Sequence, residues 1–269
     1  MSLNIDYHPS QGHVSHGNSF CSCFPPPPLS HWVESFWQLD VPAGEYFYRS
    51  VPDNSVDLII NMDCPEDIFM VTPFSSSIIF KMEGPTSYFG IRFRILGHRG
   101  LISVPLGEWS ESSNEINAAE LLEKSILNDV FQCIGASNDF THRCSNLSSI
   151  LIGAVQLTAV DRRLMRYIRY VHKNISSSIS LSDRQCSEFG LSARHLRRLV
   201  HLYLGLSPRD YMRVLRFQHT LRIINTTDCS TVWQDHYYDQ AHFIREFKSL
   251  SGLTPKKFSS LSVLYNNNR

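Results

Sequence analysis

The chain has 269 residues, with 25 basic and 25 acidic side chains, an apolar fraction of 42% and a charged fraction of 19%. This length allows one large domain or two ordinary ones, and this composition supports a packed core and argues against a wholly disordered chain. No run of about 18 apolar residues occurs and residues 1–22 lack the features of a secretory signal, so we expect no association with membranes. The seven cysteines lack the spacing of a disulfide framework, so we expect reduced thiols in a cytoplasmic protein.

The net charge of zero conceals two oppositely charged halves. Residues 1–158 carry 7 Lys and Arg against 17 Asp and Glu, a net charge of −10, whereas residues 159–269 carry 18 against 8, a net charge of +10. This asymmetry predicts two domains with different partners, and a polyanion is the expected partner of the basic half.

Residues 1–28 are polar, lack apolar periodicity and end in four consecutive prolines, a pattern that predicts a flexible tail. Neither the His-x-x-His nor the Cys-x-Cys pair in this segment has a second pair at zinc-finger spacing. We therefore favour a tail without a metal, with metal binding as the alternative, and we expect no cofactor. The candidate ligands are His8, His13, His16, Cys21 and Cys23.

Between residues 29 and 115, short aromatic and β-branched runs separated by Gly and Pro predict β-strands. Short strands at close spacing are typical of a small β-barrel or sandwich. Such a barrel either encloses one small ligand or is filled by its own side chains, and the sequence leaves both open. The runs cover residues 32–39, 56–62, 78–82 and 88–94.

From about residue 116 the apolar period changes to three and four residues, which predicts helices. A later stripe of Leu164, Ile168 and Val171 fits equally well a helix packed on its own domain and a dimer seam. The sequence thus predicts an α+β chain with three parts: the tail over residues 1–28, a domain over 29–158 that is β-rich up to 115, and an all-α domain over 159–269.

Residues 179–203 have the pattern of a helix-turn-helix unit. Gly190 allows the positive φ of a tight turn between helices, and Ser192 is a good N-cap for the second helix. Apolar side chains on that helix share one face at i, i+3 and i+4, which predicts burial against the first helix. Its other faces carry Arg194, His195, Arg197, Arg198 and His201.

A second unit of the same kind covers residues 229–250. Asp239 is the expected N-cap of its second helix, and Phe243 and Phe247 form an i, i+4 core pair. Ser207 followed by Pro208 is a strong start for a helix that joins the two units. The side chains left to face outward are Gln240, Ala241, His242, Arg245 and Lys248.

A helix-turn-helix unit lays its second helix in the major groove of DNA, where Arg pairs with guanine and Gln with adenine. Two units on one chain, joined by a stiff helix, can enter successive major grooves about 34 Å apart. The basic charge of this half suits phosphate binding. We expect the phosphate contacts to come from Lys248, Lys256, Lys257 and the helix N-termini at Ser192 and Asp239.

Residues 179–258 resemble the C-terminal domain of AraC/XylS-type transcription regulators. The resemblance implies a seven-helix domain, and it places recognition positions on the three arginines of the first unit and on Gln240, Ala241, His242 and Arg245. The chain departs from the family at His236-Tyr237, where Gly-Phe is usual, at Gln185-Cys186, and at Val200. The matching motifs are LSARHLRR (191–198), GLSP (205–208), RFQ (216–218), DQAHFIREFK (239–248) and SGLTP (251–255).

The N-terminal half resembles, more weakly, the sensor domains of one branch of that family, through VPDNSVDLIIN (51–61) and GIRF (90–93). This resemblance implies a cupin-like β-barrel that holds an effector or mediates dimerisation. The expected partners are therefore double-stranded promoter DNA, a small-molecule effector, RNA polymerase as expected of an activator, and a second copy of the chain.

Two other classes of function stay open at this point. A cupin-like barrel can hold a catalytic metal, but residues 29–115 contain only His31 and His98 and no His-x-His pair. No catalytic triad, phosphate loop or HExxH motif stands out, so we expect no enzyme. The main alternative is an interaction protein whose helix-turn-helix units no longer bind DNA, and the salt dependence of binding would distinguish the two.

Overall fold

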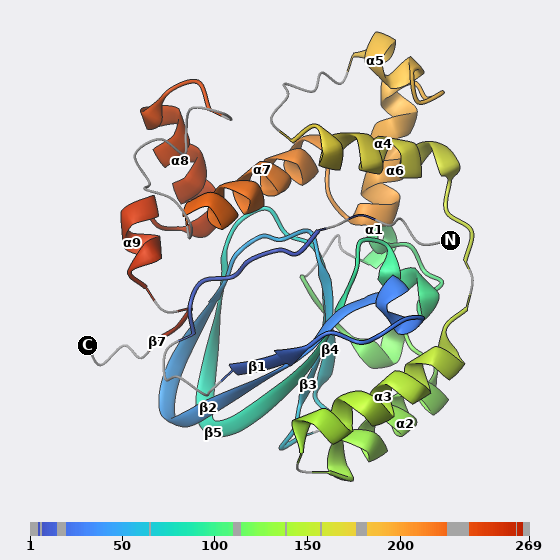
Figure 1. The fold of residues 1–269 in the computed structure, drawn as a ribbon, viewed down its shortest axis with the longest axis vertical. Helices are drawn as coiled ribbons and strands as arrows, with labels where there is room; N and C mark the ends of the chain where they lie inside the picture. Colours follow the sequence, from blue (N-terminus) through green and yellow to red (C-terminus); the bar gives the residue numbers. More distant parts are fainter. Residues whose placement is uncertain are drawn as a thin grey trace.

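The computed structural model describes residues 5, 7–14, 20–64, 66–109, 114–137, 139–156, 158–175, 182–224, 237–261 and 263–265. Figure 1 shows a curved β-sheet in the N-terminal half and a group of helices from the C-terminal half packed over one end of it. This is the predicted α+β arrangement. Among the described residues, no helix combines the length and the apolar character that crossing a membrane requires.

The sheet is antiparallel, and its strands follow the order β1-β2-β5-β3-β4-β6, with β7 added to β2. The long strands β2 and β5 pair along most of their length and curve together through the domain (Figure 1). The strands are β1 (Phe20–Cys23), β2 (Val33–Ser50), β3 (Val56–Asn61), β4 (Ile68–Val71), β5 (Ile78–Phe93), β6 (Glu115–Asn117) and β7 (Leu264–Tyr265).

Strand β5 corrects the prediction of two separate strands over 78–82 and 88–94. Gly84 and Pro85, which predicted a break, lie inside one continuous strand. Its partner β2 has an irregular register between Val41 and Gly44, directly opposite. A Cβ atom on Gly84 would lie 1.9 Å from the carbonyl oxygen of Pro42, so only glycine fits there. The glycine therefore serves a close approach between strands and does not end one.

The segment predicted as a flexible tail is packed on the molecule in its described parts. Strand β1 pairs with β2 along its whole length. Tyr7 is only 8% exposed, and its hydroxyl donates a hydrogen bond to the carbonyl oxygen of Asp53 at 2.6 Å. The prediction failed because this segment is stabilised by contacts with distant residues, which local polarity does not reveal. Of the candidate metal ligands, His16 lies outside the described residues, and the part that is described contains no group of three or more ligands arranged for a metal.

Helices of the N-terminal half close the sheet on one side and share its main apolar core. Leu147 and Leu151 of α3 are fully buried, as is Phe89 of β5, so helix and sheet pack on each other. The helices are α1 (Leu106–Trp109), α2 (Lys124–Gly135) and α3 (Phe140–Ala154), with short 3₁₀ helices at Leu29–His31, Gly97–Gly100 and Ala118–Glu120.

Six further helices form the described C-terminal half, over two apolar clusters that meet along α7. Leu164, Ile168 and Val171 of α4 are at most 1% exposed and pack within this half. The predicted stripe is therefore a core face and not a dimer seam. The helices are α4 (Arg162–Lys173), α5 (Asp183–Ser187), α6 (Ala193–Leu204), α7 (Pro208–Ile224), α8 (Gln240–Ser251) and α9 (Pro255–Ser259).

The two halves are joined by hydrogen bonds between α7 and the segment that precedes β3. Asn54 donates to the carbonyl oxygen of Tyr211 at 3.1 Å, and Gln218 donates to that of Pro52 at 2.7 Å. At the far end of the chain, β7 adds to the sheet beside β2. Helix α7 therefore lies directly against the sheet domain as well as between α6 and α8 (Figure 1).

Candidate functional site

The first helix-turn-helix unit is built from α5, a glycine turn and α6. Gly190 has a φ of +75°, the left-handed conformation that the turn requires. The side chain of Ser192 accepts a hydrogen bond from the backbone N–H of His195 at 3.2 Å, so the predicted N-cap is confirmed. Asp183 of α5 also accepts from the N–H of Ala193 at 2.8 Å, a contact between the two helices that the sequence pattern did not reveal.

The two departures from the family in this unit are accommodated by packing. Cys186 is 1% exposed in the apolar cluster under α5 and α6, and Val200 is fully buried there. Burial raises the pKa of the Cys186 thiol, with Asp183 adding to the shift. The first helix therefore docks on α6 despite its unusual sequence.

Helix α6 presents its basic residues to solvent and its apolar residues to the core. Arg194, Arg197, Arg198 and His201 are exposed, while His195 is half-buried with its Nε2 3.2 Å from Nη2 of Arg198. Neither Arg194 nor Arg197 forms an ion pair with any described residue. These guanidinium groups are therefore available to an anionic partner.

The last turn of α6 lies against the N-terminal half. A Cβ atom on Gly107 of α1 would be 2.9 Å from both the carbonyl oxygen of His201 and the Cα of Leu202. The guanidinium of Arg99 also lies 5.6 Å from the ring centre of Tyr203. Helix α1 thus supports the C-terminal end of α6 and leaves the arginines of its first two turns exposed.

Helix α8 has the same design as α6. The side chain of Asp239 accepts a hydrogen bond from the N–H of His242 at 2.6 Å, which confirms the second predicted N-cap. Phe243 and Phe247 are buried, as predicted. Of the side chains predicted to face outward, Gln240, Ala241, Arg245 and Lys248 are exposed. The first helix and turn of this unit, including His236, lie outside the described residues.

His242 differs from the other outward positions of α8. It is half-buried, and its Nε2 lies 3.0 Å from the carboxylate of Glu246. Glu246 also pairs with Arg213 and Arg216 of α7, at 3.4 and 3.6 Å. The sequence pattern missed this network because its two helices are distant along the chain, with 33 positions between Arg213 and Glu246. It also missed Tyr238, which is 91% exposed just before α8.

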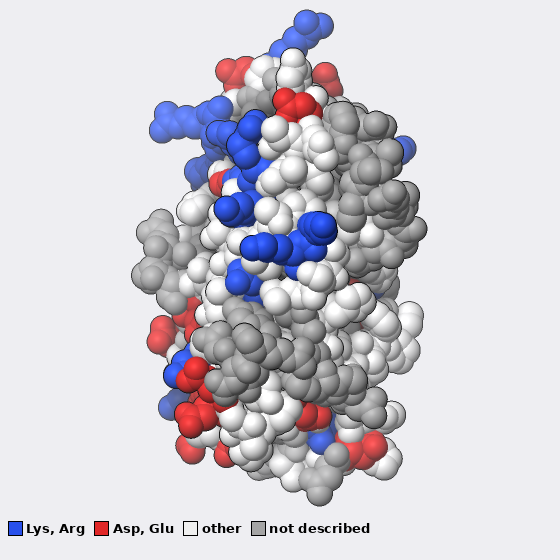
Figure 2. Space-filling model, turned by 90° about the vertical axis from the view of Figure 1, so that its left-hand side faces the viewer, with Lys and Arg blue, Asp and Glu red and all other residues white. Residues whose placement is uncertain are grey.

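Charge divides the surface as it divides the sequence. In Figure 2, Lys and Arg are concentrated on the upper part of the face shown, with a few acidic groups among them, and Asp and Glu predominate on the lower part. The upper part belongs to the C-terminal helices and the lower part to the sheet domain, as the orientation of Figure 1 indicates. A field of this kind directs a polyanion to the helical end of the molecule.

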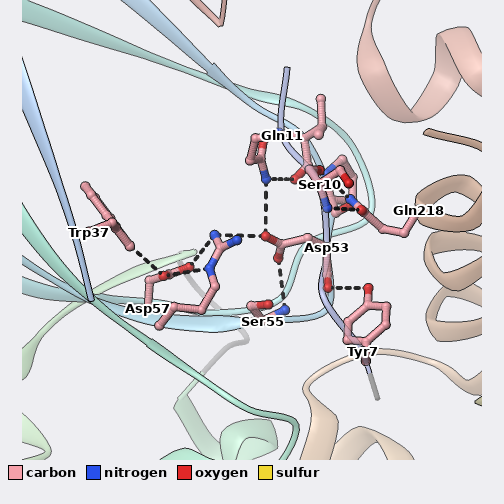
Figure 3. A network of polar contacts seen from close by, with 11 residues as sticks. Tyr7, Ser10, Gln11, Trp37, Asp53, Ser55, Asp57 and Gln218 are labelled. Atoms are coloured by element: carbon pink, nitrogen blue, oxygen red, sulfur yellow. Dashed lines mark hydrogen bonds and ion pairs between the residues drawn. The ribbon is translucent and has the colours of Figure 1, made fainter. Parts of the chain in front are cut away.

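The sheet domain contains a cavity of about 870 Å³, between the N-terminal segment and strands β2 to β6. The ion pair at its wall joins Arg92 to Asp53 at 2.9 Å and to Asp57 at 3.0 Å (Figure 3). Trp37 donates its indole N–H to Asp57 at 3.2 Å. Burial raises the pKa of the Asp53 carboxyl even though Arg92 acts in the opposite direction.

A chain of hydrogen bonds leads from this ion pair to α7. Gln11 donates to Asp53 at 3.2 Å, and the neighbouring Ser10 N–H donates to the side chain of Gln218 at 2.7 Å. Gln218 closes the chain by donating to the carbonyl of Pro52 (Figure 3). The cavity wall, the N-terminal segment and the helix between the two units are therefore in direct contact.

Comparison with known proteins finds two matching family models. Residues 185–260 match a helix-turn-helix domain family, and residues 22–115 match a family described as a domain of unknown function (DUF6597). None of the curated proteins matches the chain.

Comparison with solved structures finds several that match the chain over most of its length. An apo ToxT variant from Vibrio cholerae is 13% identical, with 91% of this chain and 98% of that chain covered and a TM-score of 0.44. ToxT from the same organism with a bound unsaturated fatty acid is 12% identical, with coverages of 92% and 99% and a TM-score of 0.41. The AraC-like transcriptional activator CuxR is 11% identical, with coverages of 75% and 86% and a TM-score of 0.23.

The turn glycine, the capped second helix with its free arginines and the matching family model define a helix-turn-helix DNA-binding protein. Residues 185–260 form its helix-turn-helix domain, and the chain is a DNA-binding transcription regulator.

Proposed function

We propose that the chain regulates transcription by placing α6 and α8 in two successive major grooves of promoter DNA. The observation that carries this proposal is the exposed basic face of α6, where Arg194 and Arg197 have no ion-pair partner among the described residues. A guanidinium without a partner can form the bidentate contact with guanine that is the commonest specific contact in the major groove.

The helix between the two units has a suitable length. Helix α7 has 17 residues, which corresponds to about 26 Å at the rise of an α-helix. Figure 1 shows α6 and α8 towards opposite ends of α7. Two recognition helices held in this way suit a spacing of about 34 Å between successive grooves once their own radii are added.

The individual roles follow from exposure and chemistry. We assign base contacts to the arginines of α6 and to Gln240, and phosphate contacts to the lysines and the two helix N-termini. His242, held by Glu246, would orient α8 and contact the backbone of the DNA. We place Lys256 and Lys257 at the edge of the proposed DNA interface. The other proposed DNA-contacting residues are Ser192, Arg194, His195, Arg197, Arg198, His201, Asp239, Gln240, Ala241, His242, Arg245 and Lys248.

The N-terminal half supplies regulation in this proposal. Its cavity has the size of a small-molecule site, and its wall is hydrogen-bonded through the N-terminal segment to α7. An effector in the cavity would therefore act on the helix that sets the relative position of α6 and α8. We extend the proposal to activation through RNA polymerase, to dimerisation through the N-terminal half and to a cytoplasmic location, and we propose no catalytic activity.

The test begins with selection of a DNA site by the full chain from random sequences. We expect Arg197→Ala to weaken binding to that site by about 1–3 kcal/mol and to relax selection at one base position. The control is Lys124→Ala, which removes one positive charge from the exposed start of α2, far from α6 in sequence. Unchanged affinity and selection for Arg197→Ala would contradict the assignment. Selection of no site, with sequence-blind binding, would favour an interaction protein without specific DNA binding.

A further inference from the structure

The cavity of the sheet domain is lined by aromatic rings and by acidic side chains. Its volume of about 870 Å³ lies within the range of small-molecule sites. Trp37, Tyr48, Phe69 and Phe80 supply much of the apolar wall. We therefore expect a ligand of this cavity to have an apolar body that contacts these rings. The polar groups between the rings determine which charge on the ligand is favoured.

Acidic groups outnumber basic ones on this wall. Six carboxylates line the cavity, against two side chains of Lys or Arg. Even with both cations charged, the described lining keeps a clear excess of negative charge. The carboxylates are Glu34, Asp53, Asp57, Glu66, Asp67 and Glu115, and the cations are Lys81 and Arg92.

Both cations already have carboxylate partners. Arg92 is held by Asp53 and Asp57 together, with distances between 2.9 and 3.0 Å. Lys81 forms an ion pair with Glu45, and its side chain is 63% exposed at the rim. A carboxylate ligand would therefore find no free cation in the described lining, and it would enter a field of its own sign.

Glu34 provides the complementary observation. Its side chain is only 7% exposed, and its Oε1 lies 2.6 Å from Nδ1 of His8. No other described residue donates a hydrogen bond to its carboxylate. The carboxylate can accept further hydrogen bonds beyond this one, and a donor carried by a ligand in the cavity would reach it from the lining.

From these observations we infer that the cavity binds a small organic cation, an amine or amidine carried on an apolar or aromatic body. Its charged head pairs with Glu34 and lies in the field of the excess carboxylates that line the cavity. Its body contacts the rings of the wall, and an aromatic face attracts a cation as well. This inference rests on the effector role proposed above, because it names the chemical class of that effector.

The experiment compares cations and anions of matched shape on the full chain. Phenethylamine and benzamidine are titrated against 3-phenylpropanoate and benzoate, with the Tm and the tryptophan fluorescence as readouts. We expect the two cations to raise the Tm by about 3 °C at ten times their Kd, and the two carboxylates to leave it unchanged. Tighter binding of the carboxylates, or no binding of either cation at millimolar concentration, would overturn the inference.

Two variants localise the binding. Glu34→Gln keeps the shape of the side chain and removes its charge, so we expect at least a tenfold loss of affinity for both cations. Glu120→Gln, an exposed glutamate outside the cavity, is the matched control and should bind as the parent does. Equal affinity in Glu34→Gln and the parent would also overturn the inference. DNA binding measured on the same samples separates this result from the proposed function, since either can fail while the other holds.

Discussion

At the scale of single residues, the side chain of His172 in α4 is one whose positive charge is disfavoured by folding. Its Nε2 lies 2.8 Å from the hydroxyl of Tyr211, and its ring packs against Tyr7 at 5.0 Å between centroids. Burial lowers the pKa of His172 to about 4, from an ordinary value near 6.5. The neutral ring is therefore part of the contact between the N-terminal segment and the helical half.

This burial predicts a loss of stability in mild acid. Above pH 6.5 the ring is neutral in both folded and unfolded chains, so it causes no pH dependence. As the pH falls from 6.5 to 4, only the unfolded chain takes up the proton, and the free energy of unfolding falls by about 3 kcal/mol. Denaturant unfolding of the parent and of His172→Gln at several pH values measures this difference.

We expect the parent to lose stability faster than His172→Gln over that pH interval, so that the two curves converge in acid. The exposed His142 provides the control, because its side chain is 79% exposed and His142→Gln should run parallel to the parent. Parallel curves for the parent and His172→Gln would show that this histidine is not buried in its neutral form.

At the scale of secondary-structure elements, the ends of the recognition helices depend on one side chain each. Ser192 accepts the N–H of His195, and Asp239 accepts the N–H of His242. We expect Ser192→Ala to lower the free energy of unfolding by about 1 kcal/mol, because it leaves a helix N–H without its partner. DNA affinity should fall as well, since the first turn of α6 carries Arg194.

Urea unfolding and a binding titration on the selected site measure the two effects. Ser149→Ala is the control, since Ser149 is an exposed serine inside α3 and caps no helix. A free energy of unfolding for Ser192→Ala equal to that of the parent would mean that the cap contributes nothing.

The helix ends also show which elements could be predicted from sequence. Caps and turn glycines act over about four residues, so local sequence is enough to place Ser192, Gly190 and Asp239 correctly. Strand β5 was divided wrongly, because the reason for Gly84 lies in the bulge of another strand. Local rules therefore sufficed for the DNA-binding helices and failed for the sheet.

At the scale of the whole molecule, the opposite charges of the two halves predict different partners from composition alone. The cavity could not be predicted in the same way, because its wall joins the N-terminal segment to strands as distant as β6. The segment over residues 7–14 was missed entirely, since the hydrogen bond from Ser10 to Gln218 spans 208 positions. Contacts of this range leave no periodic pattern in a sequence.

The packing of the two halves also bears on how the molecule would respond to salt. Asn54 and Gln218 donate their hydrogen bonds to backbone carbonyls, and Gly107 contacts α6 by close van der Waals packing. Such contacts are screened little by salt, whereas phosphate contacts are lost with the release of counterions. Salt should therefore weaken DNA binding steeply and leave the arrangement of the halves unchanged.

Hydroxyl-radical footprinting of the full chain on its selected DNA site would show directly whether α6 and α8 enter two successive major grooves. We expect two protected stretches on one face of the duplex, with centres about one helical turn, or about 10 base pairs, apart. Arg197→Ala should weaken one stretch more than the other. A single protected stretch would contradict the placement of α6 and α8 in two successive grooves. Uniform protection that does not depend on the DNA sequence would contradict it as well.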